Sequence, residues 1–152
     1  MTQISLNVTI DAPARRVWEH ISDLASHTEW MHDAVAIRFV SAATSGIGTQ
    51  MECDTRVGPF RLTDRLVVTE WAEGHAMAIR HVGTISGTGR FTLQAAGPNR
   101  TRFSWTEDLR FPWWLGGTVA ATAARPVLAR TWRRNLSNLR ALIEGGQRPA
   151  RS

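Results

Sequence analysis

The sequence predicts an α+β fold in which a curved, seven-stranded antiparallel sheet surrounds a long C-terminal helix. Three observations support this class. Residues 3–10 alternate strictly between polar and apolar side chains, and turn-forming residues divide the chain between residues 35 and 111 into six more strand-like segments. The hydrophobic period then lengthens to that of a helix between residues 128 and 143. Strands and helices are therefore segregated along the chain.

The first strand has an apolar face made by Ile4, Leu6, Val8 and Ile10. The segment DAPARRVWEHISDLASHTEW follows it. Asp11 is a suitable cap for a helix with Pro13 in its first turn, and Asp23 is a suitable cap for a second short helix. We therefore expect two short helices between the first strand and the second.

Turn signals such as TSGIGT, RVGPF and AAGPNR bound the remaining strands, which we place near residues 35–40, 48–57, 60–71, 76–83, 87–96 and 101–111. Pro126 should start or kink the last helix, which ends at Gly145 and Gly146. The polar segment 147–152 should be a frayed tail. The single domain is therefore expected to span residues 1–146.

The chain of 152 residues has a net charge of +5, with arginine as its only basic side chain apart from histidine. No apolar run approaches the roughly 18 residues of a membrane span, so we expect a soluble, cytoplasmic protein. Cys53 is the single cysteine. It therefore cannot form an internal disulfide or make a zinc site by itself, and we expect neither metal nor cofactor.

Several stretches resemble a known family. They are IDAPARRVWEHISD near the start, SGIGT before the third strand, Trp71 closing the fourth, GRFTLQ and TRFSW in the last two strands, and the arginine-rich last helix. Together they resemble the START-like (SRPBCC) superfamily, in its polyketide cyclase/dehydratase-like branch. The resemblance implies a helix-grip fold with a deep cavity between sheet and helix. Relatives bind lipids, hormones or polyketides there, and some cyclise or dehydrate them.

This branch has no shared catalytic signature, so candidate site residues come from strand alternation. Three ionisable side chains occupy inward positions on otherwise apolar strand faces: Asp64, His81 and Glu107. A four-residue connection that pairs Trp71 with Ala76 places Leu66 opposite His81. Asp64 then becomes the diagonal neighbour of His81, within reach of a direct or water-mediated hydrogen bond.

Plausible loops place Ile79, Phe91 and Glu107 in one row, so that His81 and Glu107 lie two strands apart, with backbones about 12 Å from each other. In the catalytic interpretation, His81, oriented by Asp64, is a base or acid, and Glu107 is a second proton donor across the ligand. In the structural interpretation, Asp64 and His81 satisfy each other within the sheet, while Glu107 meets an arginine or reaches the rim. The sequence leaves both open.

The same alternation, with the helical wheel of the last helix, gives the residues expected to contact a ligand in the cavity. These candidates are Trp30, Met51, Cys53, Leu66, Met77, Ile79, Phe91, Trp105, Leu109, Trp132 and Asn135.

The segment FPWWLGG, residues 111–117, has three interpretations: a gate, a membrane-touching loop, or a lid on the core, of which the lid is favoured. Arginines on the outward strand positions share that face with acidic residues, which favours cross-strand ion pairs. The aromatic residues point inward, so nucleic acid is not an expected partner.

Two functions fit these patterns. The first is binding of a hydrophobic small molecule, lipid or polyketide-like, with or without its cyclisation or dehydration by general acid/base chemistry. The second is a non-catalytic carrier or interaction module that contacts a protein or membrane through the arginine-rich sheet face or the FPWW loop. The sequence does not determine the oligomeric state.

Overall fold

The computed structural model describes residues 2–146, so the predicted tail at 147–152 lies outside the described residues. The elements in chain order are β1 (Thr2–Ile10), α1 (Ala14–Ile21), the 3₁₀ helix η1 (Leu24–Glu29), β2 (Ala34–Phe39), β3 (Gln50–Val57), β4 (Phe60–Ala72), β5 (Ala76–Val82), β6 (Ser86–Ala95), β7 (Thr101–Arg110), the 3₁₀ helix η2 (Trp113–Leu115) and α2 (Gly117–Gly145).

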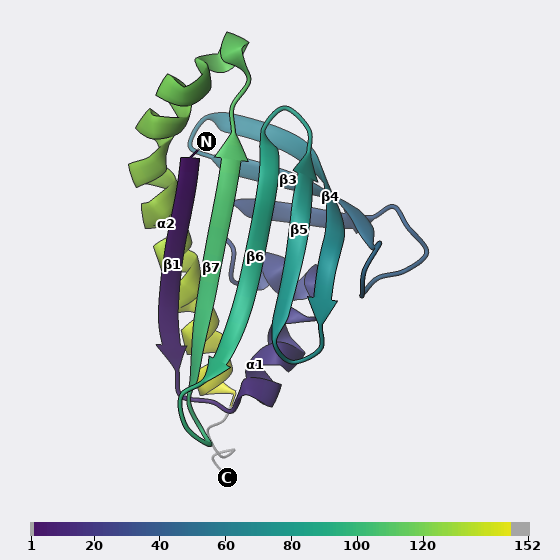
Figure 1. Cartoon of the computed structure of the whole chain (residues 1–152), viewed down its shortest axis with the longest axis vertical. Coiled ribbons are helices and arrows are strands. Elements are labelled where there is room, and N and C mark those ends of the chain that lie inside the picture. The colour runs from purple at the N-terminus through teal and green to yellow at the C-terminus, as the bar shows by residue number, and fades with distance from the viewer. Residues whose placement is uncertain (1, 147–152) are drawn as a thin grey trace.

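The seven strands form one antiparallel sheet in the order β1-β7-β6-β5-β4-β3-β2. Figure 1 shows the sheet curving, with β1, β7, β6 and β5 side by side in front and β3 passing behind them. The chain moves from one edge strand, β1, to the other, β2, through α1 and η1. Helix α2 runs along the β1 side of the sheet. The predicted fold class is confirmed.

Alternation along β7 explains how the sheet forms its inner face. Phe103, Trp105, Glu107 and Leu109 are buried, whereas the intervening side chains are half-buried or exposed. Phe103 is completely buried and packs on Phe91 of the neighbouring strand, with ring centroids 5.1 Å apart. Side chains on a strand point alternately to opposite faces, so this one strand supplies both core packing and a carboxyl group to the concave side.

Helix α2 begins at Gly117, so Pro126, which is expected from the sequence either to start or to kink the last helix, does not start it. Pro126 lies inside the helix. The preceding segment is rich in alanine, the strongest helix former, which offsets the missing backbone donor of proline. The predicted stripe is buried as expected, with Leu136, Leu139 and Ile143 almost inaccessible to solvent.

Asp11 does not cap α1, contrary to the sequence prediction. The N-cap residue is Pro13, which has no side chain able to accept a hydrogen bond from the helix. Asp11 instead lies 3.2 Å from the guanidinium of Arg100, and its backbone N–H donates to Glu144 of α2. An ion pair to the β6–β7 connection therefore replaces the predicted cap.

The β4–β5 hairpin differs in register from the predicted one near its turn. Trp71 pairs with Met77, not with Ala76, because a bulge lies between Val68 and Glu70. The bulge inserts one residue into β4 and so restores the predicted pairing of Leu66 with His81 further along. Leu66 and His81 are thus paired as predicted, although the pairing next to the turn differs.

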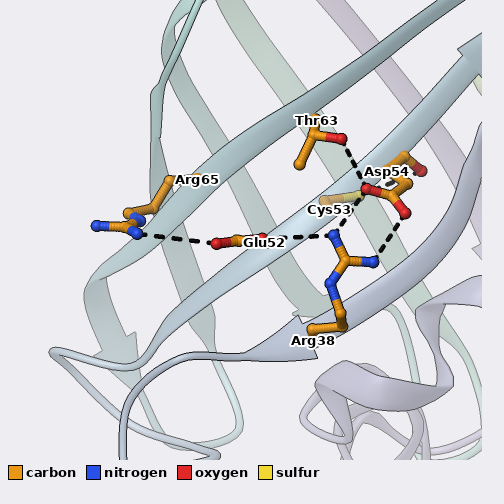
Figure 2. A network of polar contacts seen from close by, with 6 residues as sticks. All are labelled: Arg38, Glu52, Cys53, Asp54, Thr63 and Arg65. Atoms are coloured by element: carbon orange, nitrogen blue, oxygen red, sulfur yellow. Dashed lines mark hydrogen bonds and ion pairs between the residues drawn. The ribbon is translucent and has the colours of Figure 1, made fainter.

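The outer face of the sheet carries ion pairs between neighbouring strands. Arg38 lies 2.8 Å from Asp54 and 3.4 Å from Glu52, and Arg65 lies 3.8 Å from Glu52. Figure 2 shows these contacts. Arg90 makes a similar pair with Glu70. The expected cross-strand pairing of this face is confirmed for these arginines. In the described part of the chain, no helix is long and apolar enough to cross a membrane.

Candidate functional site

A cavity of about 640 Å³ lies between the concave face of the sheet, η1 and the first half of α2. Its wall is mainly apolar, with side chains such as Met51, Leu66, Met77 and Trp105. The exposed side chains of Phe60 and Leu115 mark its opening, between the β3–β4 turn and the η2–α2 junction. A space of this size suits a drug-sized apolar molecule.

Asp64, His81 and Glu107 all line this cavity. His81 Nε2 lies 2.9 Å from Glu107 Oε2, so an N–H of the imidazole donates to the carboxylate. The second oxygen of Glu107, Oε1, accepts a hydrogen bond from the indole N–H of Trp105 at 3.0 Å. Both oxygens of Glu107 are therefore held, and the predicted pairing of His81 with Asp64 is replaced by a His81–Glu107 pair.

Two glycines on β6 make this pair possible. Gly87 lies between His81 and Leu109, and Gly89 lies between Ile79 and Glu107, so no side chain of β6 stands between the two partners. A Cβ atom at Gly89 would lie 2.5 to 2.9 Å from the carboxyl atoms of Glu107. The His81 and Glu107 backbones are two strands apart, as predicted, but their side chains meet above the glycines.

Asp64 is the carboxyl group of the site that has no fixed partner. Its side chain is buried, and its Oδ1 atom has no hydrogen-bond partner among residues 2–146. It lies on β4 opposite Cys53 and close to Gly83, where a Cβ atom would overlap Asp64 Oδ1. A buried carboxyl without a partner is costly when ionised, which makes Asp64 the least satisfied polar group of the wall.

The surroundings raise the pKa of two groups in this site, His81 and Asp64. Burial opposes the charged form of His81, but the hydrogen bond and charge of Glu107, with the charge of Asp64, outweigh it and raise the pKa of His81. Burial raises the pKa of Asp64, and the positive charge of His81 only partly opposes this effect. Both groups therefore hold their protons to higher pH than they would in water.

Comparison with known proteins places these features in a family. The sequence profile described as polyketide cyclase / dehydrase and lipid transport matches residues 1–144. The chain belongs to this family. A comparison with curated proteins finds no match.

Solved structures of three proteins illustrate the shared fold. The Zhui aromatase/cyclase from Streptomyces sp. R1128 is 17% identical with a TM-score of 0.78, over 97% of this chain and 96% of that one. A START superfamily protein from Mycobacterium smegmatis is 14% identical with a TM-score of 0.77, over 95% and 99%. TTHA0849 from Thermus thermophilus is 14% identical with a TM-score of 0.76, over 97% and 100%. This family member thus has the helix-grip fold.

Most residues expected to contact a ligand in this helix-grip protein do line its cavity. They are Met51, Cys53, Leu66, Met77, Ile79, Phe91, Trp105, Leu109 and Trp132. Alternation was sufficient to find those on the strands, because every one lies on the concave face. Leu24 and His27 of η1 also line the cavity. Strand alternation could not predict them, because they lie in a helix.

Trp30 and Asn135 do not line the cavity, contrary to the sequence prediction. Trp30 is buried behind the wall, where its ring packs edge-on against Trp105. Asn135 donates to Asp33 Oδ1 at 2.6 Å and accepts from the backbone N–H of His32 at 3.0 Å. Asn135 thereby fastens α2 to the segment before β2, because a buried amide is stable only where its donors and acceptors are paired.

The favoured interpretation of FPWWLGG as a lid on the core is wrong for its two tryptophans. Trp113 is 86% exposed and Trp114 is 61% exposed, whereas Phe111 and Leu115 of the same segment line the cavity. The segment therefore forms part of the rim, with its largest rings facing solvent. Such exposed rings beside an opening are typical of a contact surface.

No metal centre is evident in residues 2–146, where no three His, Cys, Asp or Glu side chains lie close enough together to hold an ion. Cys53 lines the cavity, and burial is the main reason that the pKa of its thiol rises to about 11. It is therefore a protonated, weakly polar part of the wall at neutral pH.

Proposed function

We propose that this protein binds a hydrophobic small molecule that carries a carbonyl group, and that His81, Glu107 and Asp64 catalyse proton transfer on it. The observation that carries this proposal is the His81–Glu107 hydrogen bond in the wall of an apolar cavity. The family description, which names polyketide cyclases and dehydrases, and the aromatase/cyclase among the solved structures agree with this chemistry.

The proposed role of His81 follows from which of its nitrogens is engaged. Nε2 donates to Glu107, and Nδ1 has no hydrogen-bond partner among residues 2–146. Neutral His81 therefore presents Nδ1 as a base that can remove a proton α to a carbonyl. The resulting imidazolium is stabilised by the negative charge of Glu107, which also orients the ring. Cyclisation and dehydration both need this removal of a proton.

The two carboxyl groups exchange the roles that the sequence predicts for them. Glu107 is fixed by His81 and Trp105, so it acts as a positioning residue rather than as a free acid. Asp64 has no partner for Oδ1, and burial raises its pKa, so it is the group suited to give a proton to a carbonyl oxygen or to a departing hydroxyl. Departure of the protonated hydroxyl as water would complete a dehydration.

Exchange of the α-protons of 2-tetralone in D₂O, followed by proton NMR, tests this proposal. The compound combines an apolar two-ring body with an acidified α-position. We expect the protein to accelerate exchange and His81→Gln to reduce the rate about 10²-fold or more, the usual contribution of a general base. Glu107→Gln should reduce it less. Glu70→Gln, on the outer face, is the matched control, and an unchanged rate in His81→Gln refutes the catalytic assignment.

A second candidate function is transport of an apolar ligand to and from a membrane, without catalysis. The exposure of Trp113 and Trp114 at the rim favours it, and lipid transport is also part of the family description. The arginine-rich sheet face is a poorer contact surface, because Arg38, Arg65 and Arg90 are already paired with acidic residues there. Sedimentation with anionic vesicles that is lost in Trp113→Ser/Trp114→Ser would support transport.

A further inference from the structure

A second hollow, of about 500 Å³, lies beside the main cavity between the end of β3 and the middle of α2. Its lining is basic, with Arg56 from β3 and Arg130 and Arg134 from α2. The other lining residues are His32, Asp33, Val57, Gly58 and Thr131. Asp33 and Val57 also line the main cavity, so the two spaces share part of one wall.

The three arginines of this hollow lack the acidic partners found elsewhere in the protein. On the outer sheet face, Arg38 and Arg90 each pair with a carboxylate. Within residues 2–146, Arg56, Arg130 and Arg134 make no ion pair or side-chain hydrogen bond. A positive field therefore remains uncompensated here.

The one acidic residue of the hollow, Asp33, does not neutralise these arginines by contact. Its two carboxylate oxygens accept hydrogen bonds from Trp132 Nε1 at 2.9 Å and from Asn135 Nδ2 at 2.6 Å. Both oxygens are thus turned toward buried groups of α2. The formal charge of the lining stays positive even when Asp33 is counted, because one acid faces three arginines.

The backbone fixes the points from which the three exposed arginine side chains project. Arg130 and Arg134 are four residues apart on α2 and so lie on the same side of the helix. The backbone N–H of Arg56, at the end of β3, donates to the carbonyl of Asp33 at 2.8 Å. The side chain of Asp33 in turn accepts a hydrogen bond from Asn135 of α2. The three charges therefore come from two regular elements, β3 and α2, that are joined by hydrogen bonds to Asp33.

We propose that this hollow binds a phosphate-type dianion, and that the dianion is the polar end of a ligand whose apolar part occupies the main cavity. Three guanidinium groups match a doubly charged tetrahedral group, because each can donate two hydrogen bonds to its oxygens. The shared wall at Asp33 and Val57 places the two parts next to each other. The second half of this proposal rests on the proposed function, whereas the first half does not.

The anion site is tested with inorganic phosphate alone, by following the backbone amide signals of Gly58 and Thr131 in ¹⁵N NMR spectra. We expect saturable shifts that weaken with added salt, as an exposed ionic site should. They should disappear in Arg130→Gln/Arg134→Gln and weaken in Arg56→Gln. Arg133→Gln removes one positive charge, as Arg56→Gln does, from a neighbouring position outside the hollow and should leave them unchanged. No saturation, or equal loss in Arg133→Gln, overturns the site.

The link to the main cavity is tested with octyl phosphate and octanol, as competitors of the uncharged fluorophore N-phenyl-1-naphthylamine. We expect octyl phosphate to compete about tenfold better than octanol, and this preference to vanish in Arg130→Gln/Arg134→Gln but persist in Arg133→Gln. Phosphate binding without this preference would limit the site to free anions and overturn the second half. Failure of the fluorophore and octanol to bind contradicts the proposed function, while the inorganic phosphate result still decides the anion site.

Discussion

Glu107 on β7 accepts a hydrogen bond from His81 on β5 across a strand to which neither belongs, with His81 Nε2 and Glu107 Oε2 2.9 Å apart. The intervening strand, β6, contributes Gly87 and Gly89 at the positions between them. Gly87 has φ of 140°, and a Cβ atom there would overlap the backbone carbonyl of Asp108. Gly89 has no such backbone requirement and is needed for the space that Glu107 occupies.

Gly89→Ala should break the His81–Glu107 pair. The new methyl group would overlap the Glu107 carboxyl, so we expect the carboxyl to move away and the pKa of His81 to fall. Overpacking at this buried position should also lower the free energy of unfolding by about 1–3 kcal/mol. An NMR titration of the histidine ring carbons measures the pKa. Thr88→Ala, on the exposed side of the same strand, should change neither quantity, and an unchanged His81 titration in Gly89→Ala contradicts this account.

Glu107→Gln should destabilise the protein more at low pH than at high pH. The pKa of His81 is raised in the folded protein, so its interaction with Glu107 stabilises fully below the ordinary pKa of 6.5 and fades as the pH rises through the raised value. Urea unfolding at about pH 6 and about pH 9 measures the difference. A destabilisation that is the same at both pH values would show that the pair does not titrate as described. Glu70→Gln serves as the exposed control.

Asp64→Asn should stabilise the protein at neutral pH. Burial raises the pKa of Asp64, so ionisation opposes folding, and this penalty is absent at low pH, where Asp64 is protonated in both states. We expect the melting temperature to rise by about 2–4 °C at neutral pH, as for a gain near 1 kcal/mol, and the gain to vanish near pH 3. Calorimetry at both pH values checks this.

Asp54→Asn is the opposite case, because Arg38 and Thr63 lower the pKa of Asp54 to about 2. That substitution should destabilise at neutral pH. If Asp64→Asn also destabilises there, Asp64 has a favourable partner that the structure does not show. A gain in stability together with a loss of catalysis would be the usual trade-off at an active site.

Cys53 should react slowly with iodoacetamide in the folded protein. Its pKa of about 11 leaves a thiolate fraction at pH 8 that is about two orders of magnitude below that of a free cysteine. Mass spectrometry of the alkylated protein gives the rate. N-phenyl-1-naphthylamine should slow it further by filling the cavity that Cys53 lines, and unfolding in urea should restore ordinary reactivity. Rapid alkylation that the fluorophore does not affect would contradict this placement.

Truncating two tryptophans of this chain should have very different effects. Trp105 is 4% exposed and stacks on Trp132 with ring centroids 5.1 Å apart, so Trp105→Ala should cost about 3–5 kcal/mol of unfolding free energy. Trp113 is 86% exposed, so Trp113→Ala should cost about 0.5 kcal/mol or less. Chemical denaturation of both variants measures these values. Similar losses would mean that Trp113 packs in solution.

Local patterns were sufficient for most of the fold. Alternation in the first strand and turn signals around the other six located all seven strands within about two residues. Strand alternation placed Asp64, His81 and Glu107 on the concave side, and the structure has all three in the cavity wall. The sequence left open whether Pro126 starts or kinks the last helix, because the first turns of α2, around Gly117 and Ala120, are half-buried or exposed and carry no apolar stripe.

The sequence by itself determined which face most residues of the sheet occupy, since that depends on local alternation, which the bulge in β4 interrupts between Val68 and Glu70. Tertiary structure decided which polar groups touch. His81 could be assigned to Asp64 or to Glu107 only once it was known that Gly87 and Gly89 leave the space between β5 and β7 open. The two glycines of SGTGR indicate this open space in the sequence. Which side chains meet there depends on the register of β5, β6 and β7 and on the reach of the His81 and Glu107 side chains. Trp30 and Asn135 likewise lie behind the cavity wall because packing of η1 and α2, not periodicity, sets their depth.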